Sequence, residues 1–249
     1  MIRLENISKS FNGNVTLPGF TFDIQDGRFY TIVGPNGCGK STLLNILAGT
    51  LDKDGGDISY ANSDGSLEVG YVWQDYRSTI FPWLSISENI AFPLKVRGLS
   101  LKEREKAVLD LIEDFGVEIN LKKKIYELSG GQQQLVNILR AMITRPKLLL
   151  FDEPFSALDQ YRSWQMGSML EMMWLMHKSS VLFISHDIDE AILLADEIIL
   201  MNKHGNIEKV LKNDMSHSRT KEMMMTKEHL ELKNEIIEFL FNQNTWNIN

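Results

Sequence analysis

Short hydrophobic runs alternate along the chain with segments of helical periodicity. The runs are FYTIV at 29–33, LLLF at 148–151, VLFI at 181–184 and EIILM at 197–201. Each run is as long as a strand and has almost no polar alternation, which is typical of strands covered on both faces. The pattern predicts an α/β fold with a largely parallel sheet and helices between its strands.

A hydrophobic stripe at helical spacing lies within WQMGSMLEMMWLM at 164–176. Its members are Met166, Met169, Leu170, Met173 and Trp174. A stripe of this width normally packs into a core, so we expect core residues here rather than a cofactor site. The segment is also too short and, with Gln165 and Glu171, too polar to cross a bilayer.

No strand-like run is evident between Tyr76 and Asn137. Residues 100–115 within this region open with a serine that is followed three residues later by a glutamate, and an amphipathic pattern continues from there. This spacing is the signature of a capping box at a helix start. We therefore expect a helical subdomain at about 77–137, inserted into a domain of residues 1–215.

Residues 216–249 differ from the rest of the chain. They contain three consecutive methionines at 223–225 and then a helical pattern in KEHLELKNEIIEFLF. We predict a C-terminal helical extension. It either packs back on the sheet of its own chain or contacts a partner, and we favour the first.

The composition narrows the class of protein. With 43% hydrophobic and 24% charged residues, the chain is typical of globular proteins, whereas its net charge of −7 argues against nucleic-acid binding. Cys38 is the single cysteine, which excludes an internal disulfide and favours a reducing compartment. Because neither a signal-peptide layout nor a membrane-spanning apolar run is evident, we expect a cytoplasmic protein that reaches a membrane only through a partner.

A glycine-rich loop joins the run at 29–33 to the helical pattern STLLNILAG. Its residues are Gly34, Pro35, Asn36, Gly37, Cys38, Gly39, Lys40, Ser41 and Thr42. They fit the phosphate-binding pattern G-x-x-x-x-G-K-[ST] in its required context, between a strand and a helix. The backbone N–H groups can wrap a polyphosphate, Lys40 can reach the β- and γ-phosphates, and the Ser41 hydroxyl can ligate Mg²⁺.

Two further motifs carry chemistry. Asp152 and Glu153 directly follow LLLF, where Asp152 can hold Mg²⁺ through water and Glu153 can polarise the water that attacks the phosphate. The segment LSGGQ at 128–132 places a serine cap and two glycines at a helix start, which makes a second anion-binding nest. Because one nucleotide needs only one loop, we expect this second nest to serve the nucleotide of another subunit. Its residues are Ser129, Gly130, Gly131 and Gln132.

In these motifs the chain resembles, over about residues 1–210, the ATP-binding subunits of ATP-binding cassette (ABC) transporters. GPNGCGKST resembles the Walker A loop, LSGGQ the family signature, LLLFDEP the Walker B strand and SALD at 156–159 the D-loop. The resemblance implies a P-loop NTPase (RecA-like) core with a mostly parallel sheet, an N-terminal antiparallel β subdomain and a helical signature subdomain. It also implies ATP and Mg²⁺ as ligands and a head-to-tail homodimer or heterodimer, in which the signature residues act in trans.

The resemblance extends to single residues. Gln74 matches the Q-loop glutamine, which contacts the metal or the water, and His186 matches the switch histidine at the γ-phosphate. Together with Glu153 they form the implied catalytic set. Phe11 lies where the family places an aromatic that stacks on adenine, and a core or turn phenylalanine remains the alternative. In one departure, residues 133–135 read Gln-Gln-Leu where the family commonly has arginines, so we expect an altered local charge network rather than lost activity.

The stretch after Gln74 carries the apolar segment IFPWL at 80–84, which either faces a partner or packs inside the helical region. In the family, this neighbourhood receives the membrane permease subunits. The sequence of this stretch resembles that of the nitrate, sulfonate and taurine importers. The resemblance implies that the chain is peripheral on the inner face of the membrane and works with an extracytoplasmic solute-binding protein. The alternatives are the ATPase subunit of an exporter and a soluble cassette ATPase of DNA repair or translation, which would normally bring a second cassette or basic surfaces.

Cys38 carries one more expectation. It lies among backbone N–H groups at a helix start and two residues before Lys40. Such surroundings lower the pKa of a thiol, so we expect a reactive thiolate that a maleimide would label unless Mg-ATP protected it. The alternative is a small, inert residue beneath the loop.

Overall fold

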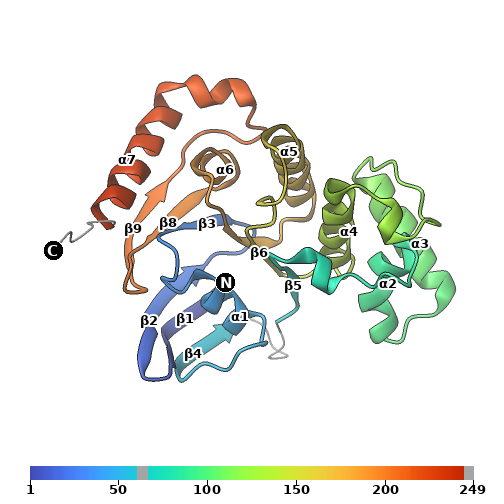
Figure 1. The fold of residues 1–249 in the computed structure, drawn as a ribbon, viewed down its shortest axis with the longest axis horizontal. Helices are drawn as coiled ribbons and strands as arrows, with labels where there is room; N and C mark the ends of the chain where they lie inside the picture. Colours follow the sequence, from blue (N-terminus) through green and yellow to red (C-terminus); the bar gives the residue numbers. More distant parts are fainter. Residues whose placement is uncertain (61–66, 244–249) are drawn as a thin grey trace.

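The computed structural model describes residues 1–60 and 67–243 of the chain. Their central feature is a six-stranded sheet in the order β5-β6-β7-β3-β8-β9, which is parallel except for the pairing of β9 with β8 (Figure 1). Its strands are β3 (Phe29–Val33), β5 (Val69–Val72), β6 (Leu148–Asp152), β7 (Ser180–Ile184), β8 (Glu197–Met201) and β9 (Ile207–Lys212). The four hydrophobic runs thus form β3, β6, β7 and β8, which confirms their prediction as strands.

The sheet is buried on both faces, which explains why these runs lack polar alternation. Along β7, Val181 and Phe183 belong to one hydrophobic cluster, whereas Leu182 and Ile184 belong to the other. The first cluster is shared with the long helices of the chain. The second lies between the sheet, α1 (Lys40–Leu47) and a separate antiparallel sheet. Successive side chains of a strand point to opposite faces, so two covered faces require apolar residues throughout.

The antiparallel sheet has the strand order β2-β1-β4 and lies at the bottom in Figure 1. Its strands are β1 (Ile2–Phe11), β2 (Asn14–Ile24) and β4 (Gly55–Tyr60). The fold is therefore the α/β architecture that the resemblance implied, with a mostly parallel sheet and an antiparallel sheet beside it.

A helical region lies to one side of the parallel sheet (Figure 1). It comprises α2 (Ile86–Val96), α3 (Leu101–Asp114), α4 (Gly130–Met142) and the short 3-10 helices Tyr76–Thr79 and Ile125–Glu127. The absence of strands between residues 76 and 137, all of them described, is confirmed. Ser100 and Glu103 form the predicted capping box, and Ser85 and Glu88 form a second one at the start of α2.

Helices α5 (Gln160–His177) and α6 (Ile188–Leu194) cover one face of the parallel sheet (Figure 1). The stripe on α5 is core, as predicted. Leu170, Met173 and Trp174 are buried, and Met166 and Met169 pack half-buried against the same cluster. The Trp174 ring meets that of Phe29 on β3 edge-on, with 5.6 Å between the centroids.

The C-terminal segment contains the 3-10 helix Lys221–Met225 and α7 (Lys227–Gln243). It packs back on its own chain, as we favoured, where α7 lies against α6 and its Glu235 forms an ion pair with Lys209 of β9. Ile236 and His229 are completely buried, and the imidazole Nε2 of His229 lies 2.8 Å from Asp189 on α6. The Lys233 ammonium donates to the same carboxylate at 2.7 Å. In the part of the chain that the structure describes, no helix is long and apolar enough to span a bilayer.

Candidate nucleotide site

The glycine-rich loop leaves β3 at its carboxyl end and runs into α1. Two of its glycines, Gly37 and Gly39, have φ angles of +79° and +103°, in the left-handed region that side chains disfavour. Gly34 is required for a different reason, because a Cβ there would lie 2.3 Å from the backbone carbonyl oxygen of Met201 at the end of β8. The sequence therefore needs glycine at each of these positions to turn the backbone N–H groups toward a common point.

Lys40, the first residue of α1, is 6% exposed. Its ammonium donates hydrogen bonds to the backbone carbonyl oxygens of Gly34 at 2.8 Å and Pro35 at 2.9 Å. An ammonium has three donors, so a further one is left for a phosphate oxygen. The loop carbonyls thus hold the charge at the position that phosphate binding needs.

Cys38 corrects one of our expectations. Its side chain is only 2% exposed and packs in the cluster beneath the loop. Burial raises the pKa of the thiol and outweighs Lys40 and the loop N–H groups, which act in the lowering direction. The prediction of a thiolate was wrong, because the sequence showed the helix start and the lysine but not the burial.

A hydroxyl and a carboxylate meet beside the loop. The Oγ of Ser41 donates to Oδ1 of Asp152 at 3.0 Å, although the two residues are far apart in the chain. Asp152 is buried at the carboxyl end of β6, and burial raises the pKa of its carboxyl group despite the Ser41 hydrogen bond, which lowers it. Hydroxyl and carboxylate oxygens are the ligands that Mg²⁺ prefers together with phosphates, so this pair fits a magnesium ion.

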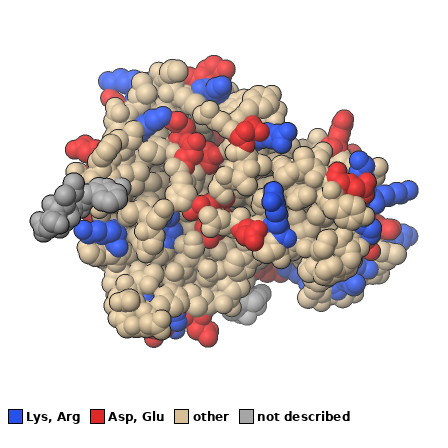
Figure 2. All heavy atoms as spheres, in the orientation of Figure 1, with Lys and Arg blue, Asp and Glu red and all other residues tan. Residues whose placement is uncertain are grey.

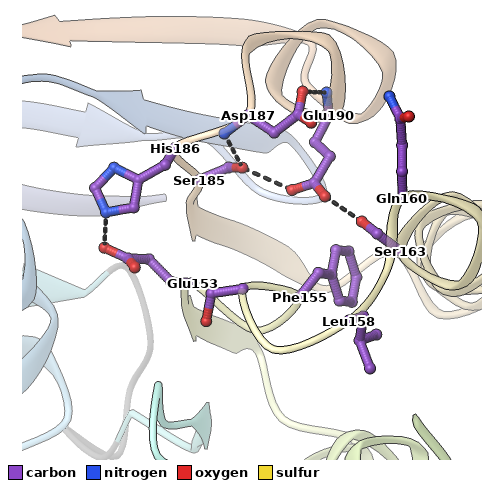
Figure 3. Close-up of a pocket in the computed structure, with 10 residues that line it drawn as sticks. Glu153, Phe155, Leu158, Gln160, Ser163, Ser185, His186, Asp187 and Glu190 are labelled. Carbon is purple, nitrogen blue, oxygen red and sulfur yellow. Dashed lines mark hydrogen bonds and ion pairs between the residues drawn. The ribbon is translucent and has the colours of Figure 1, made fainter.

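Glu153, one residue beyond β6, is held by two predicted partners. The side-chain Nε2 of Gln74 donates to Glu153 Oε2 at 2.7 Å, and the imidazole Nε2 of His186 contacts Oε1 (Figure 3). The backbone at Glu153 has a φ of +47°, unusual for a residue with a side chain, and strain of this kind gathers at active sites. The structure thus brings together Glu153, Gln74 and His186, which the sequence places far apart.

The signature segment lies in the helical region. Ser129 is the N-cap of α4, its Oγ accepts from the Gln132 N–H, and the Gln132 side chain accepts from the Ser129 N–H at 3.1 Å. An open pocket of about 590 Å³ lies between this segment and α5 and is lined by Ser129, Gly131 and Gln132. Ser129 and Gln132 are exposed, whereas Gly131 is half-buried, with Leu158 Cδ2 3.7 Å from its Cβ position.

Other side chains take the positions 133–135, where the family commonly has arginines, and Arg140 follows further along the same helix. The Gln133 amide donates to the carbonyl oxygens of Ile125 and Leu128, each at 3.2 Å, and so anchors the segment that leads into the signature. Leu135 is buried in the core. Arg140 donates to the Thr79 carbonyl oxygen at 2.7 Å, and burial lowers its pKa to about 10.

Phe11 ends β1 with its side chain 43% exposed. The ammonium of Lys9 lies 5.6 Å from the centre of the ring. An exposed ring of this kind is available for stacking, which disfavours the alternative of a core phenylalanine. Figure 2 shows Lys and Arg mixed with Asp and Glu over the visible face of the molecule rather than one broad basic patch.

Sequence reasoning missed a group of polar residues behind His186. A pocket of about 450 Å³ is lined by Glu153, His186 and further polar side chains that include Ser163, Ser185 and Glu190 (Figure 3). Ser185 directly precedes the switch histidine, which was the one signal in the sequence. The contribution of Ser163 and Glu190 depends on contacts between separate helices, which no local pattern reveals.

Known proteins similar to this chain agree with the nucleotide site described above. The model of the ABC transporter family matches residues 17–156. The aliphatic sulfonates import ATP-binding protein SsuB of Bacillus thuringiensis is 38% identical over 229 residues, which cover 88% of this chain and 89% of that protein. The spermidine/putrescine import ATP-binding protein PotA of Photobacterium profundum is 39% identical over 216 residues, which cover 84% of this chain and 57% of that protein.

Solved structures of ABC cassettes have the same fold as this chain. The dimeric bacterial ABC transporter cassette MJ0796 superposes with a TM-score of 0.74 at 29% identity, covering 87% of this chain and all of that one. A second structure of that cassette, in a post-hydrolysis state with ADP and phosphate, matches with the same TM-score at 28% identity. CbiO1 of Clostridium perfringens gives 0.77 at 25% identity, covering 95% of this chain and 98% of that one. This chain belongs to the ABC transporter family, as an ATP-binding subunit that hydrolyses ATP.

Proposed function

We propose that this chain powers the import of a small solute, of the sulfonate class, as one of two ATP-binding subunits on the cytoplasmic face of a membrane. The observation that carries the ATPase part is the position of Glu153, which Gln74 and His186 hold beside the Ser41–Asp152 pair. The names of the relatives SsuB and PotA support import over export, and the overall acidic charge disfavours a nucleic-acid substrate.

The geometry supports the following catalytic roles. Glu153 is the general base that orients and polarises the attacking water, because its carboxylate lies at the end of β6 beside the phosphate loop. Gln74 holds one carboxylate oxygen and reaches toward the same water or metal. His186 holds the other oxygen, so these two side chains leave the carboxylate little freedom to rotate. With ATP bound, the His186 imidazole would contact the γ-phosphate.

The loop Gly34–Thr42 binds the phosphates through its N–H groups and Lys40. Ser41 and Asp152, assisted by Gln74, would hold Mg²⁺, which would supply positive charge to the phosphates. Phe11 stacks on adenine. These side chains bind and position the nucleotide, whereas Glu153 and His186 act on the bond that breaks.

The second nucleotide contact comes from a partner cassette. The nest formed by Ser129, Gly130, Gly131 and Gln132 belongs to the helical region, whereas the phosphate loop belongs to the sheet region. We infer that each nest binds the nucleotide of the opposite subunit, and the dimeric cassette MJ0796 supports this arrangement. ATP then closes the pair and hydrolysis reopens it.

We infer that the segment Ile80–Leu84 contacts the membrane permease subunits. Trp83 is 69% exposed, and the Phe81 ring packs between it and Phe92 on α2. Ile80 is buried, so the apolar segment is divided between the core and the surface. An exposed tryptophan on a supported aromatic base fits the binding of a hydrophobic helix end from a partner.

Uptake measurements test the function. Cells of the source organism that lack the gene are complemented with the wild-type chain or with Glu153→Gln, and uptake of a labelled aliphatic sulfonate and of spermidine is followed. We expect sulfonate uptake to require the gene and to fail with Glu153→Gln, while spermidine uptake stays unchanged. Loss of spermidine uptake alone would move the solute class to polyamines. Unchanged uptake of both would contradict the proposed solute class.

A further inference from the structure

Glu190 lies in the first turn of α6, and its side chain points back toward the end of β7 (Figure 3). Both of its carboxylate oxygens are engaged. Oε1 accepts from the hydroxyl of Ser163 on α5, and Oε2 accepts from the hydroxyl of Ser185 at 2.6 Å. Burial raises the pKa of this carboxyl group, with the nearby Asp187 acting in the same direction.

The bond to Ser185 controls the backbone around His186. A serine hydroxyl has one proton, and a carboxylate can only accept, so Ser185 must donate its proton to Glu190. Its oxygen then accepts from the Asp187 N–H at 2.9 Å. Glu190 therefore fixes the residues on both sides of His186, whose imidazole contacts Glu153.

The bond to Ser163 adds a second connection. Ser163 lies in the first turn of α5, directly after the D-loop segment 156–159. Glu190 thus joins three separate pieces of the pocket wall, namely α6, the switch-histidine loop and the start of α5 (Figure 3).

This arrangement is costly for a residue that would serve packing alone. Among the described residues, no Lys, Arg or His side chain forms an ion pair with Glu190, and both of its partners are neutral hydroxyls. A largely buried carboxylate without a cation is unfavourable, and such groups gather at functional sites.

We propose that Glu190 is a positioning residue of the ATPase site, which holds His186 in register with Glu153 through Ser185 and links that loop to the start of α5. This inference rests on the proposed roles of Glu153 and His186. Glu190 does not reach the nucleotide itself and acts through its two serine partners.

The test compares Glu190→Gln and Ser185→Ala with the wild-type chain. An amide can accept from only one of the two hydroxyls, because its other end is a donor. We expect kcat for ATP hydrolysis to fall roughly tenfold or more in both variants, as when a hydrogen bond to a charged group is lost, while the Kd for ATP and the melting temperature stay close to wild type. Glu228→Gln removes an exposed carboxylate on α7 and is the matched control.

A spectroscopic readout separates positioning from general stability. The chain has five histidines, and comparison with His186→Ala assigns the ring ¹⁵N signal of His186. In Glu190→Gln the His186 signal should shift or broaden, whereas those of His177 and His204, which lie elsewhere, should not. If Glu190→Gln does not fold, Ser185→Ala supplies the same measurement with a smaller change.

The outcomes are distinguishable. Loss of activity in His186→Ala together with wild-type kcat in both Glu190→Gln and Ser185→Ala would overturn this inference alone. Full activity in His186→Ala would overturn the proposed role of the histidine, and the inference with it. In a third outcome, kcat falls in both variants, the Kd for ATP rises by the same factor, and the melting temperature drops. That result would show that Glu190 only stabilises the fold.

Discussion

His217 joins the C-terminal segment to the core, and its replacement should measure how strongly that segment is held. Its imidazole lies between two carboxylates, with Nδ1 2.8 Å from Glu171 on α5 and Nε2 2.9 Å from Asp196 before β8. Both acids are nearly buried, at 5% and 9% exposed. Two flanking acceptors require both ring nitrogens to donate, so the imidazole is bound as the cation.

His217→Ala leaves these two carboxylates without their shared donor. Breaking a buried ion pair costs about 3–5 kcal/mol of the free energy of unfolding. The low end applies here, because Asp196 keeps the Phe29 N–H at 2.9 Å and the Arg28 guanidinium at 3.5 Å, and Glu171 keeps the Ser218 N–H at 3.2 Å. We therefore expect His217→Ala to lose about 3 kcal/mol.

The effect should depend on pH. Burial alone would lower the pKa of His217, but the hydrogen bonds to Asp196 and Glu171 outweigh it and hold the pKa above the ordinary 6.5. A raised pKa in the folded state stabilises the fold fully below 6.5, and this stabilisation is lost as the pH rises through the folded-state value. The pKa of Asp196 is lowered despite burial, through its bonds to His217 and Phe29, so its own contribution is present above the ordinary 3.8 and lost on acidification.

Urea unfolding at about pH 5.5 and about pH 8.5 tests the size and the pH dependence of the His217 contribution. Tryptophan fluorescence is a suitable probe, since the Trp174 ring lies 4.6 Å from that of His217. The gap between wild type and His217→Ala should be largest at the lower pH and should narrow at the higher one, while His204→Ala, in an exposed turn, should unfold like wild type at both. A gap below about 1 kcal/mol at the lower pH, or one that widens as the pH rises, would refute the reasoning.

Three further predictions concern separate parts of the chain. Lys40→Ala removes the charge held at the phosphate loop, so the Kd for ATP in a titration should rise about tenfold or more, and an unchanged Kd would contradict the loop assignment. Cys38 should react with a maleimide only slowly, with or without Mg-ATP, because its thiol is buried and has a raised pKa. Fast labelling of the folded chain would contradict that burial, and Cys38→Ser measures the background labelling. Ile236→Ala on α7 should cost about 2–4 kcal/mol in urea unfolding, with Leu230→Ala at an exposed position as its control, and equal stability of the two would show that α7 is not anchored.

The elements that the sequence predicted well have local causes. FYTIV and EIILM became β3 and β8 at the predicted residues, because burial on both faces leaves a continuous apolar run. The helix that begins after Ser100 was predictable from its capping box, which needs only residues three apart. The phosphate loop was recognisable because its glycines are demanded by its own backbone.

What the sequence could not predict depends on distant contacts. The pKa of Cys38 follows from a cluster that includes Leu17 and Met201, which arrive from other strands. The bonds of Glu190 to Ser163 and of His217 to Glu171 join residues that are 27 and 46 positions apart. Neither pair leaves a periodic or spaced signal, so only the folded chain reveals them.

The close approach of Gly34 to β8 has a consequence for the kinetics of nucleotide capture. The loop is pinned at one end by the Met201 carbonyl, and Gly39 is packed at the other against Leu17 and Thr16, whose atoms lie 2.9–3.2 Å from its Cβ position. The conformational entropy of forming this curve is therefore lost when the chain folds, not when ATP arrives. ATP should therefore bind to a preorganised loop. Substitutions that loosen the loop at Gly34 or at Gly39 should mainly lower the association rate constant for ATP, even where every group that binds phosphate is retained.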